Sequence, residues 1–106
     1  MGGEYTQTDM SLIATLHELP AGTTKSFVHR DRPAILIHDA DGIRAFYNIC
    51  THDGGTCELV GRDLQCCVHG ARFNPRTGKA LSHPAPLDTK LTPIPVRIDG
   101  DAVLVD

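Results

Sequence analysis

The feature that most constrains this chain is the concentration of cysteine in residues 48–78, "NICTHDGGTCELVGRDLQCCVHGARFNPRTG". All four cysteines and two of the six histidines lie there. Two short motifs stand out, C-x-H at Cys50–His52 and C-x-x-H at Cys66–His69. Glycine follows each motif, and glycine permits the positive φ angles and close backbone approach that a tight loop needs. Two such loops side by side at one end of a sheet could present two thiolates and two imidazoles to a single site.

Two inorganic groups fit two cysteines and two histidines. One is a tetrahedral zinc ion. The other is a [2Fe–2S] cluster with both cysteines on one iron and both histidines on the other. Zinc knuckles usually separate paired ligands by two or more residues, so C-x-H suits zinc poorly. Bridging sulfides carry negative charge and need N–H donors, which glycine-rich loops supply. The motifs therefore favour the cluster, and a structural Cys2His2 zinc module stays open as an alternative.

Length and composition bound the class of protein. The chain has 106 residues, which suits one domain, and its 41% hydrophobic and 22% charged residues are typical of a soluble globular protein. The net charge of −3 and the lack of a Lys/Arg run argue against nucleic-acid binding. Neither a membrane-length apolar stretch nor a signal peptide is present. We therefore expect a cytoplasmic protein with no membrane partner, in a reducing compartment that disfavours disulfides.

Short apolar segments separated by turn residues predict an all-β fold. The expected strands are residues 11–16, 25–30, 33–39, 43–48, 64–66 and 71–73, with a closing hairpin over 95–105. Asp41-Gly42 and Asp99-Gly100 are two-residue hairpin signals. Two prolines predict a loop over residues 82–88. Residues 1–10 are predicted to be a polar tail, which leaves 11–106 as the single domain.

Beyond the two motifs, the chain resembles the Rieske-type ferredoxins, the small electron carriers of bacterial ring-hydroxylating dioxygenase systems. Five segments, which together span nearly everything from residue 12 onward, carry the likeness: "LIATLHELPAG" (12–22), "FYNICTHDGG" (46–55), "CCVHGARFNPRTGKAL" (66–81), "HPAPL" (83–87) and "IPVRIDGDAVLVD" (94–106). The resemblance implies a Rieske fold, a small antiparallel β-sandwich with two cluster-binding loops at one end, at about 50–56 and 66–72. The fourth segment is similar to the proline loop that covers the cluster.

The resemblance also implies the ligands. Cys50 and Cys66 would bind one iron of the [2Fe–2S] cluster, and His52 and His69 would bind the other. Imidazole is neutral where thiolate is charged, so the histidine-ligated iron is the easier one to reduce. We expect the histidine side to face solvent, because electrons must leave through it to a docked partner.

The implied function is one-electron transfer, and the chain itself would not be an enzyme. A flavin-containing, NAD(P)H-dependent reductase would reduce the cluster, and the carrier would pass electrons to a terminal oxygenase. No 2-His-1-carboxylate iron site is apparent in the sequence. We expect a monomer. A small Rieske-like subunit of a redox enzyme complex, such as a nitrite reductase, is the alternative.

The chain departs from the family pattern around its extra cysteines. Cys67 stands where the family usually has proline, which opens a rival register with Cys67 as the second thiolate ligand; we prefer Cys66, because C-x-x-H is the family spacing. We interpret Cys57 and Cys67 as buried thiols, in preference to a shifted disulfide, a redox sensor or a Cys–His nucleophile. Ala71 and Phe73 replace the Ser and Tyr of high-potential Rieske centres, which predicts a low reduction potential.

The remaining histidines lie outside any ligand spacing. Three of them, His17, His29 and His38, are in or near predicted strands, and we expect them at the surface. His83 precedes the proline loop and could approach the cluster.

Overall fold

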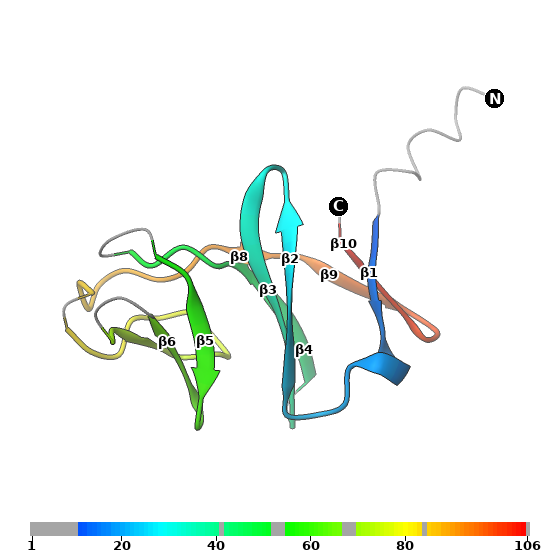
Figure 1. Ribbon diagram of the computed structural model, residues 1–106, viewed down its shortest axis with the longest axis horizontal. Coiled ribbons are helices and arrows are strands. Elements are labelled where there is room, and N and C mark those ends of the chain that lie inside the picture. The colour runs from blue at the N-terminus through cyan, green and yellow to red at the C-terminus, as the bar shows by residue number, and fades with distance from the viewer. Residues whose placement is uncertain (1–10, 41, 52–54, 67–69, 84, 106) are drawn as a thin grey trace.

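Three antiparallel sheets lie next to one another in the computed structural model, which describes residues 11–40, 42–51, 55–66, 70–83 and 85–105 (Figure 1). The elements in chain order are β1 (Ser11–Thr15), the 3-10 helix η2 (Leu16–Glu18), β2 (Thr23–His29), β3 (Arg32–Asp39), β4 (Gly42–Tyr47), β5 (Cys57–Val60), β6 (Asp63–Cys66), β7 (Arg72–Phe73), β8 (Pro93–Ile94), β9 (Val96–Asp99) and β10 (Ala102–Val105). The predicted all-β architecture is confirmed. Among the described residues, none of the helical structure has the length and apolar character that crossing a bilayer requires.

The middle layer is the four-stranded sheet β2-β3-β4-β8, with β5-β6-β7 on one side of it and β1-β10-β9 on the other (Figure 1). Residues 34–37 of β3 are all buried, as a continuous apolar run predicts for a strand covered on both faces. Alternate side chains point to opposite faces of a strand, so Ile35 and Ile37 enter one core, while Ala34 and Leu36 enter the other.

Each face of the middle sheet therefore carries its own hydrophobic core. The loop core, shared with the β5-β6-β7 sheet, consists of Ile35, Ile37, Phe46, Cys50, Cys57, Leu64, Cys66, Ala71, Phe73, Ala80, Ala85 and Leu91. The terminal core, shared with the β1-β10-β9 sheet, consists of Ala14, Leu19, Ala34, Leu36, Ala45, Ile94, Val103 and Val105. Three of the four cysteines thus pack in the core between the middle sheet and the predicted ligand loops.

The hairpin turns differ in part from the prediction. His29 pairs with Arg32, and the two turn residues between them, Arg30 and Asp31, have φ angles of 53° and 65°. A tight hairpin turn of the I′ type needs positive φ at both central positions. This turn was not predicted from the sequence, because neither of its central residues is glycine. In the closing hairpin, Asp99 pairs with Ala102, so the turn is one residue later than predicted.

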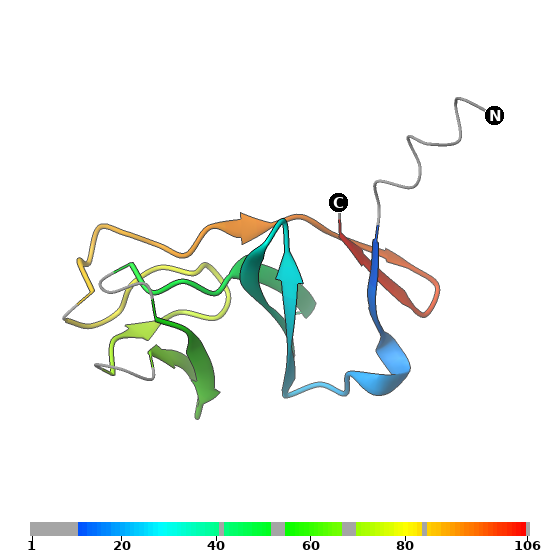
Figure 2. The same cartoon turned by 45° about the horizontal axis from the view of Figure 1, so that its top comes forward.

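The chain between the predicted proline loop and the closing hairpin forms the short strand β8, which the sequence did not predict. Ile94 pairs with Ala45 and Pro93 pairs with Phe46, so β8 adds an edge to the middle sheet. Figure 2 shows this segment running past the middle sheet from the loop end of the molecule to β9. It connects the predicted proline loop to the β1-β10-β9 sheet.

Candidate metal centre

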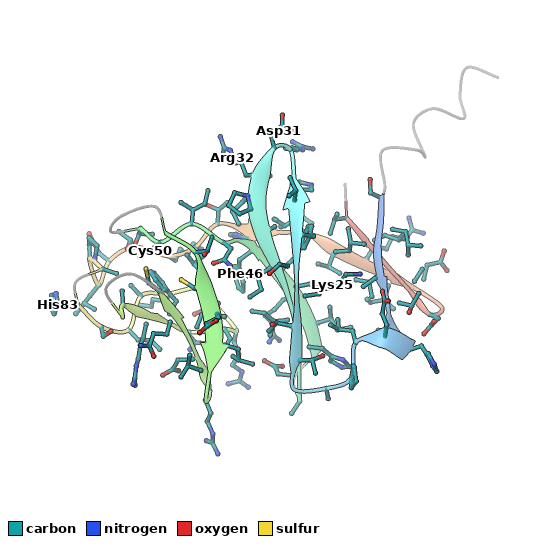
Figure 3. The ribbon with its side chains drawn as sticks, viewed as in Figure 1. Lys25, Asp31, Arg32, Phe46, Cys50 and His83 are labelled. Atoms are coloured by element: carbon teal, nitrogen blue, oxygen red, sulfur yellow. The ribbon has the colours of Figure 1, made fainter. Side chains whose placement is uncertain are left out.

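The two predicted thiolate ligands lie in the same core although they come from different loops. Cys50 follows the end of β4, and Cys66 is the last residue of β6. Both side chains are only 2% exposed, and both belong to the loop core. Figure 3 shows Cys50 at the end of the molecule that carries β5 and β6. His52 and His69, the predicted imidazole ligands, lie outside the described residues, as does Cys67, so these assignments stay predictions.

Backbone hydrogen bonds close the base of each loop. The Cys50 N–H donates to the carbonyl oxygen of Gly55 at 2.6 Å. In the second loop the Cys66 N–H donates to the carbonyl oxygen of Ala71 at 2.8 Å, and the Gly70 N–H donates to the carbonyl oxygen of Cys66 at 3.0 Å. Gly70 has a φ of 74°, which suits glycine. Each cysteine is therefore held at the hydrogen-bonded start of its loop.

The side chain of Asn48 joins the first loop to β5. It is 4% exposed. Its Nδ2 donates to the carbonyl oxygen of Cys57 at 2.8 Å, and its Oδ1 accepts from the Cys57 N–H at 2.7 Å. The amide thus pairs with the Cys57 backbone as a neighbouring strand would. Sequence reasoning missed this positioning residue, and the available signal was an asparagine inside the otherwise apolar stretch "AFYNIC".

Residues 85–91, in a third loop, pack against the first loop. Ala85 and Leu91 are buried in the loop core. The hydroxyls of Thr89 and Thr51 lie 2.8 Å apart, and Thr89 Oγ1 is 2.6 Å from the carbonyl oxygen of Pro86. Because a hydroxyl has one proton and a carbonyl has none, Thr89 donates to Pro86 and accepts from Thr51. The third loop is therefore tied to the residue beside Cys50.

The thiols of Cys50 and Cys66 fit the cysteine-ligated iron of a [2Fe–2S] cluster. Two thiols from separate loops are buried in the same core, where a thiolate charge needs a bound cation to offset its desolvation. Within the described ranges, no three His, Cys, Asp or Glu side chains are arranged to hold a metal ion. Cys57 is buried in the same core, as predicted.

The other histidines agree only partly with prediction. His17 is exposed as expected. The surface prediction is wrong for His29, which is 8% exposed and has its Nδ1 2.7 Å from the Tyr47 hydroxyl. The Tyr47 ring packs against the His29 imidazole, and its hydroxyl is a hydrogen-bond partner for Nδ1. This buried nitrogen therefore has the partner that burial requires. His38 is half-buried, with its Nδ1 2.6 Å from the Leu19 carbonyl oxygen. His83 is exposed at the outer end of the molecule (Figure 3).

An all-β fold that buries one cysteine from each of two hydrogen-bonded loops is the arrangement expected of a Rieske-type iron–sulfur protein. The family model described as "Rieske [2Fe-2S] domain" matches residues 9–95. The chain belongs to the Rieske family and carries a Rieske-type [2Fe–2S] cluster.

Known relatives narrow the class further. The chain is 32% identical over 94 residues to the ferredoxin component of the naphthalene 1,2-dioxygenase system of Pseudomonas aeruginosa, which covers 86% of this chain and 88% of that protein. The ferredoxin of carbazole 1,9a-dioxygenase from Nocardioides aromaticivorans IC177 is similar in structure, with a TM-score of 0.73 and 27% identity over 91% of this chain and 95% of that one. A complex of reduced oxygenase and oxidised ferredoxin in carbazole 1,9a-dioxygenase contains a further similar chain, with a TM-score of 0.76, 25% identity and 91% coverage of each. The chain is an electron carrier of the ferredoxin type.

Proposed function

We propose that this chain is the ferredoxin component of a bacterial ring-hydroxylating oxygenase system. An NAD(P)H-dependent flavin reductase supplies its electrons, and a terminal oxygenase receives them. The observation that supports this most is the pair of buried cysteines on two closed loops, in a chain similar along most of its length to dioxygenase ferredoxins. The complex of a similar ferredoxin with its oxygenase supports the second partner. We further propose that the protein is a cytoplasmic monomer.

In this proposal Cys50 and Cys66 hold one iron, and His52 and His69 hold the other. The bound cluster supplies one reversible electron. The chain's own residues set the direction in which the electron leaves, because both cysteines are buried in the loop core. His52 and His69 would hold the other iron, on the side of the cluster away from that core. Electrons enter and leave at the loop end.

The proposed contact surface at that end includes exposed apolar side chains. Leu81 precedes the proline loop and Leu87 lies in it; they are 45% and 46% exposed, and Pro86 is also exposed. Exposed apolar side chains next to a redox centre suit a small, transient interface, since they bind a partner without the slow dissociation of a large hydrophobic contact. Such an interface allows one surface to serve the reductase and the oxygenase in turn.

The test begins with the purified protein. We expect two irons and two sulfides per chain and an EPR signal of low average g after reduction. Stoichiometric zinc without labile sulfide would contradict the proposal. Cys66→Ser should abolish the cluster, whereas Cys67→Ser, the matched control next to it, should retain it. Loss of colour in the Cys67 variant alone would show that the rival register is correct.

The second stage measures electron transfer. The reductase of a naphthalene dioxygenase system with NADH should reduce the carrier, and adding the matching oxygenase with substrate should reoxidise it. Leu87→Glu should slow reoxidation several-fold while leaving the visible spectrum unchanged; Leu12→Glu, at a similarly exposed leucine of β1 in the sheet on the opposite side of the molecule, is the control. Stable copurification with a large catalytic chain would instead support the alternative of a subunit of a redox enzyme complex.

A further inference from the structure

Cys57 lies directly across the β5-β6 hairpin from Cys66. The two residues are Cα partners in the antiparallel register, four positions before and after the same turn. Directly opposed residues of an antiparallel pair place their side chains on the same face of the sheet. In agreement, both cysteines belong to the loop core, with exposed fractions of 4% and 2%.

The backbone hydrogen bonds show which type of cross-strand pair this is. The N–H and C=O of Cys57 bond to Asn48, and those of Cys66 bond to Ala71 and Gly70. Both residues thus direct their backbone groups away from each other, which defines a non-hydrogen-bonded pair. In such pairs the Cα atoms are about 4.5 Å apart and the side chains are at their closest. A disulfide needs Cα atoms about 4.4–6.8 Å apart, so the backbone already meets this requirement.

We propose that Cys57 and Cys66 are a modification site, at which a cross-strand disulfide forms when the cluster is lost in the presence of a peroxide. The inference rests on the proposed role of Cys66 as a ligand. While Cys66 is bound to iron, its sulfur is not available to Cys57. Once the iron has left, the two thiols face each other in the same core.

The chemistry balances with hydrogen peroxide as the oxidant. One thiol is oxidised to a sulfenic acid, and peroxide is reduced to one water. The second thiol attacks the sulfenic sulfur, the S–S bond forms, the S–O bond breaks and a second water leaves. Two thiols thus lose two electrons and two protons overall. Cys57 lines an open groove of about 430 Å³ together with Thr56 and Glu58, which gives a small oxidant a route to this thiol.

The disulfide would have a specific consequence for the cluster. It removes the Cys66 thiolate, so iron and sulfide cannot be reinserted until a thiol reductant reopens the bond. It also prevents further oxidation of Cys66 to the sulfinic acid, a step that is irreversible in most proteins. The hairpin would thus hold a ligand cysteine in a recoverable state between loss of one cluster and insertion of the next.

The test uses the full-length holoprotein. Hydrogen peroxide is added until the visible bands bleach, remaining thiols are alkylated, and trypsin cleavage after Arg62 separates Cys57 from Cys66. Tandem mass spectrometry should find a Cys57–Cys66 link in most of the bleached wild type. Cluster recovery with ferrous iron and sulfide should be at least ten-fold greater after dithiothreitol than without it.

Two variants make the result decisive. Cys67→Ser should keep the Cys57–Cys66 link and the same dependence on dithiothreitol. Cys57→Ser should keep its cluster as purified but lose the link, and dithiothreitol should change its recovery by less than two-fold. A link to Cys50 or Cys67, random pairing, or no link would overturn the inference and leave the electron-carrier proposal intact. Loss of the cluster in Cys57→Ser as purified would instead show that the ligand assignment itself is wrong.

Discussion

The buried amide of Asn48 allows a quantitative test of how the first ligand loop is held. Asn48→Ala removes two hydrogen bonds, of 2.7 and 2.8 Å, and leaves the N–H and C=O of Cys57 without that partner. A buried polar group that loses its partner costs about 1–3 kcal/mol, so two such groups cost about 2–6 kcal/mol. Asn48 and Cys57 both line the groove beside β2, where water can replace part of the loss. We therefore expect a decrease of about 2–3 kcal/mol in the free energy of unfolding.

Urea unfolding followed by far-UV circular dichroism measures this decrease. Ser26→Ala is the matched control, because Ser26 lines the same groove but is exposed, and we expect a change of no more than about 0.5 kcal/mol there. Since Asn48 holds the chain just before Cys50, the variant should also lose iron to a chelator several-fold faster than wild type. A loss of stability below about 0.5 kcal/mol for Asn48→Ala would refute the argument that this amide fixes the loop.

Three further predictions concern the scaffold. Gly78→Ala should destabilise the fold by about 3 kcal/mol, because Gly78 has a φ of 78° and a Cβ there would lie 2.9 Å from the Leu91 carbonyl oxygen; urea unfolding would show it. Asp31→Gly should stabilise the fold by about 0.5–1 kcal/mol in the same assay, since glycine relieves a positive φ. The pKa of Glu18 is lowered first by the N–H of Thr15 and then by Lys25, so its stabilising effect is present at neutral pH and lost as the pH falls through that lowered value. An NMR titration of this carboxyl should have its midpoint below the usual glutamate range, and a midpoint within that range would contradict the capping interaction.

The parts of the fold that the sequence predicted are those in which one physical signal dominates. The run "AILI" marked β3 because only a strand covered on both faces buries four consecutive apolar residues. The β8 strand was missed because it contributes only two residues, one of them proline, and neither length nor alternation marks it. The Arg30-Asp31 turn was missed because pairing on either side imposes positive φ on residues that do not favour it.

The candidate site could be predicted to a similar extent. Spacing and resemblance led to Cys50 and Cys66, and the structure buries both in one core. Neither signal led to Asn48, whose role depends on Cys57 being its spatial neighbour, or to the Thr51–Thr89 contact between loops 38 residues apart in the chain. Pairings of this kind depend on tertiary packing, which a single sequence does not encode as a local pattern.

The reduction potential follows from two side chains that the structure places in the loop core. Ala71 and Phe73 are fully buried there, and the Ala71 carbonyl oxygen accepts from the Cys66 N–H. High-potential Rieske centres carry hydroxyls at these two positions, and hydrogen bonds to cluster sulfurs raise the potential. Neither residue here has a donor, so we expect a potential near the bottom of the Rieske range, at about −150 mV.

Restoring both donors tests this expectation. If each new hydrogen bond stabilises the reduced state over the oxidised state by about 1.2 kcal/mol, each raises the potential by about 50 mV, because 59 mV corresponds to about 1.4 kcal/mol for one electron. Ala71→Ser with Phe73→Tyr should therefore raise the midpoint by about 100 mV in protein-film voltammetry, with the EPR signal showing that the cluster is retained. Phe73→Leu is the control, since it changes the packing next to Leu64 without adding a donor, and it should shift the midpoint by less than about 20 mV. A wild-type midpoint clearly above zero near neutral pH would refute the reasoning, because some other group would then be stabilising the added electron.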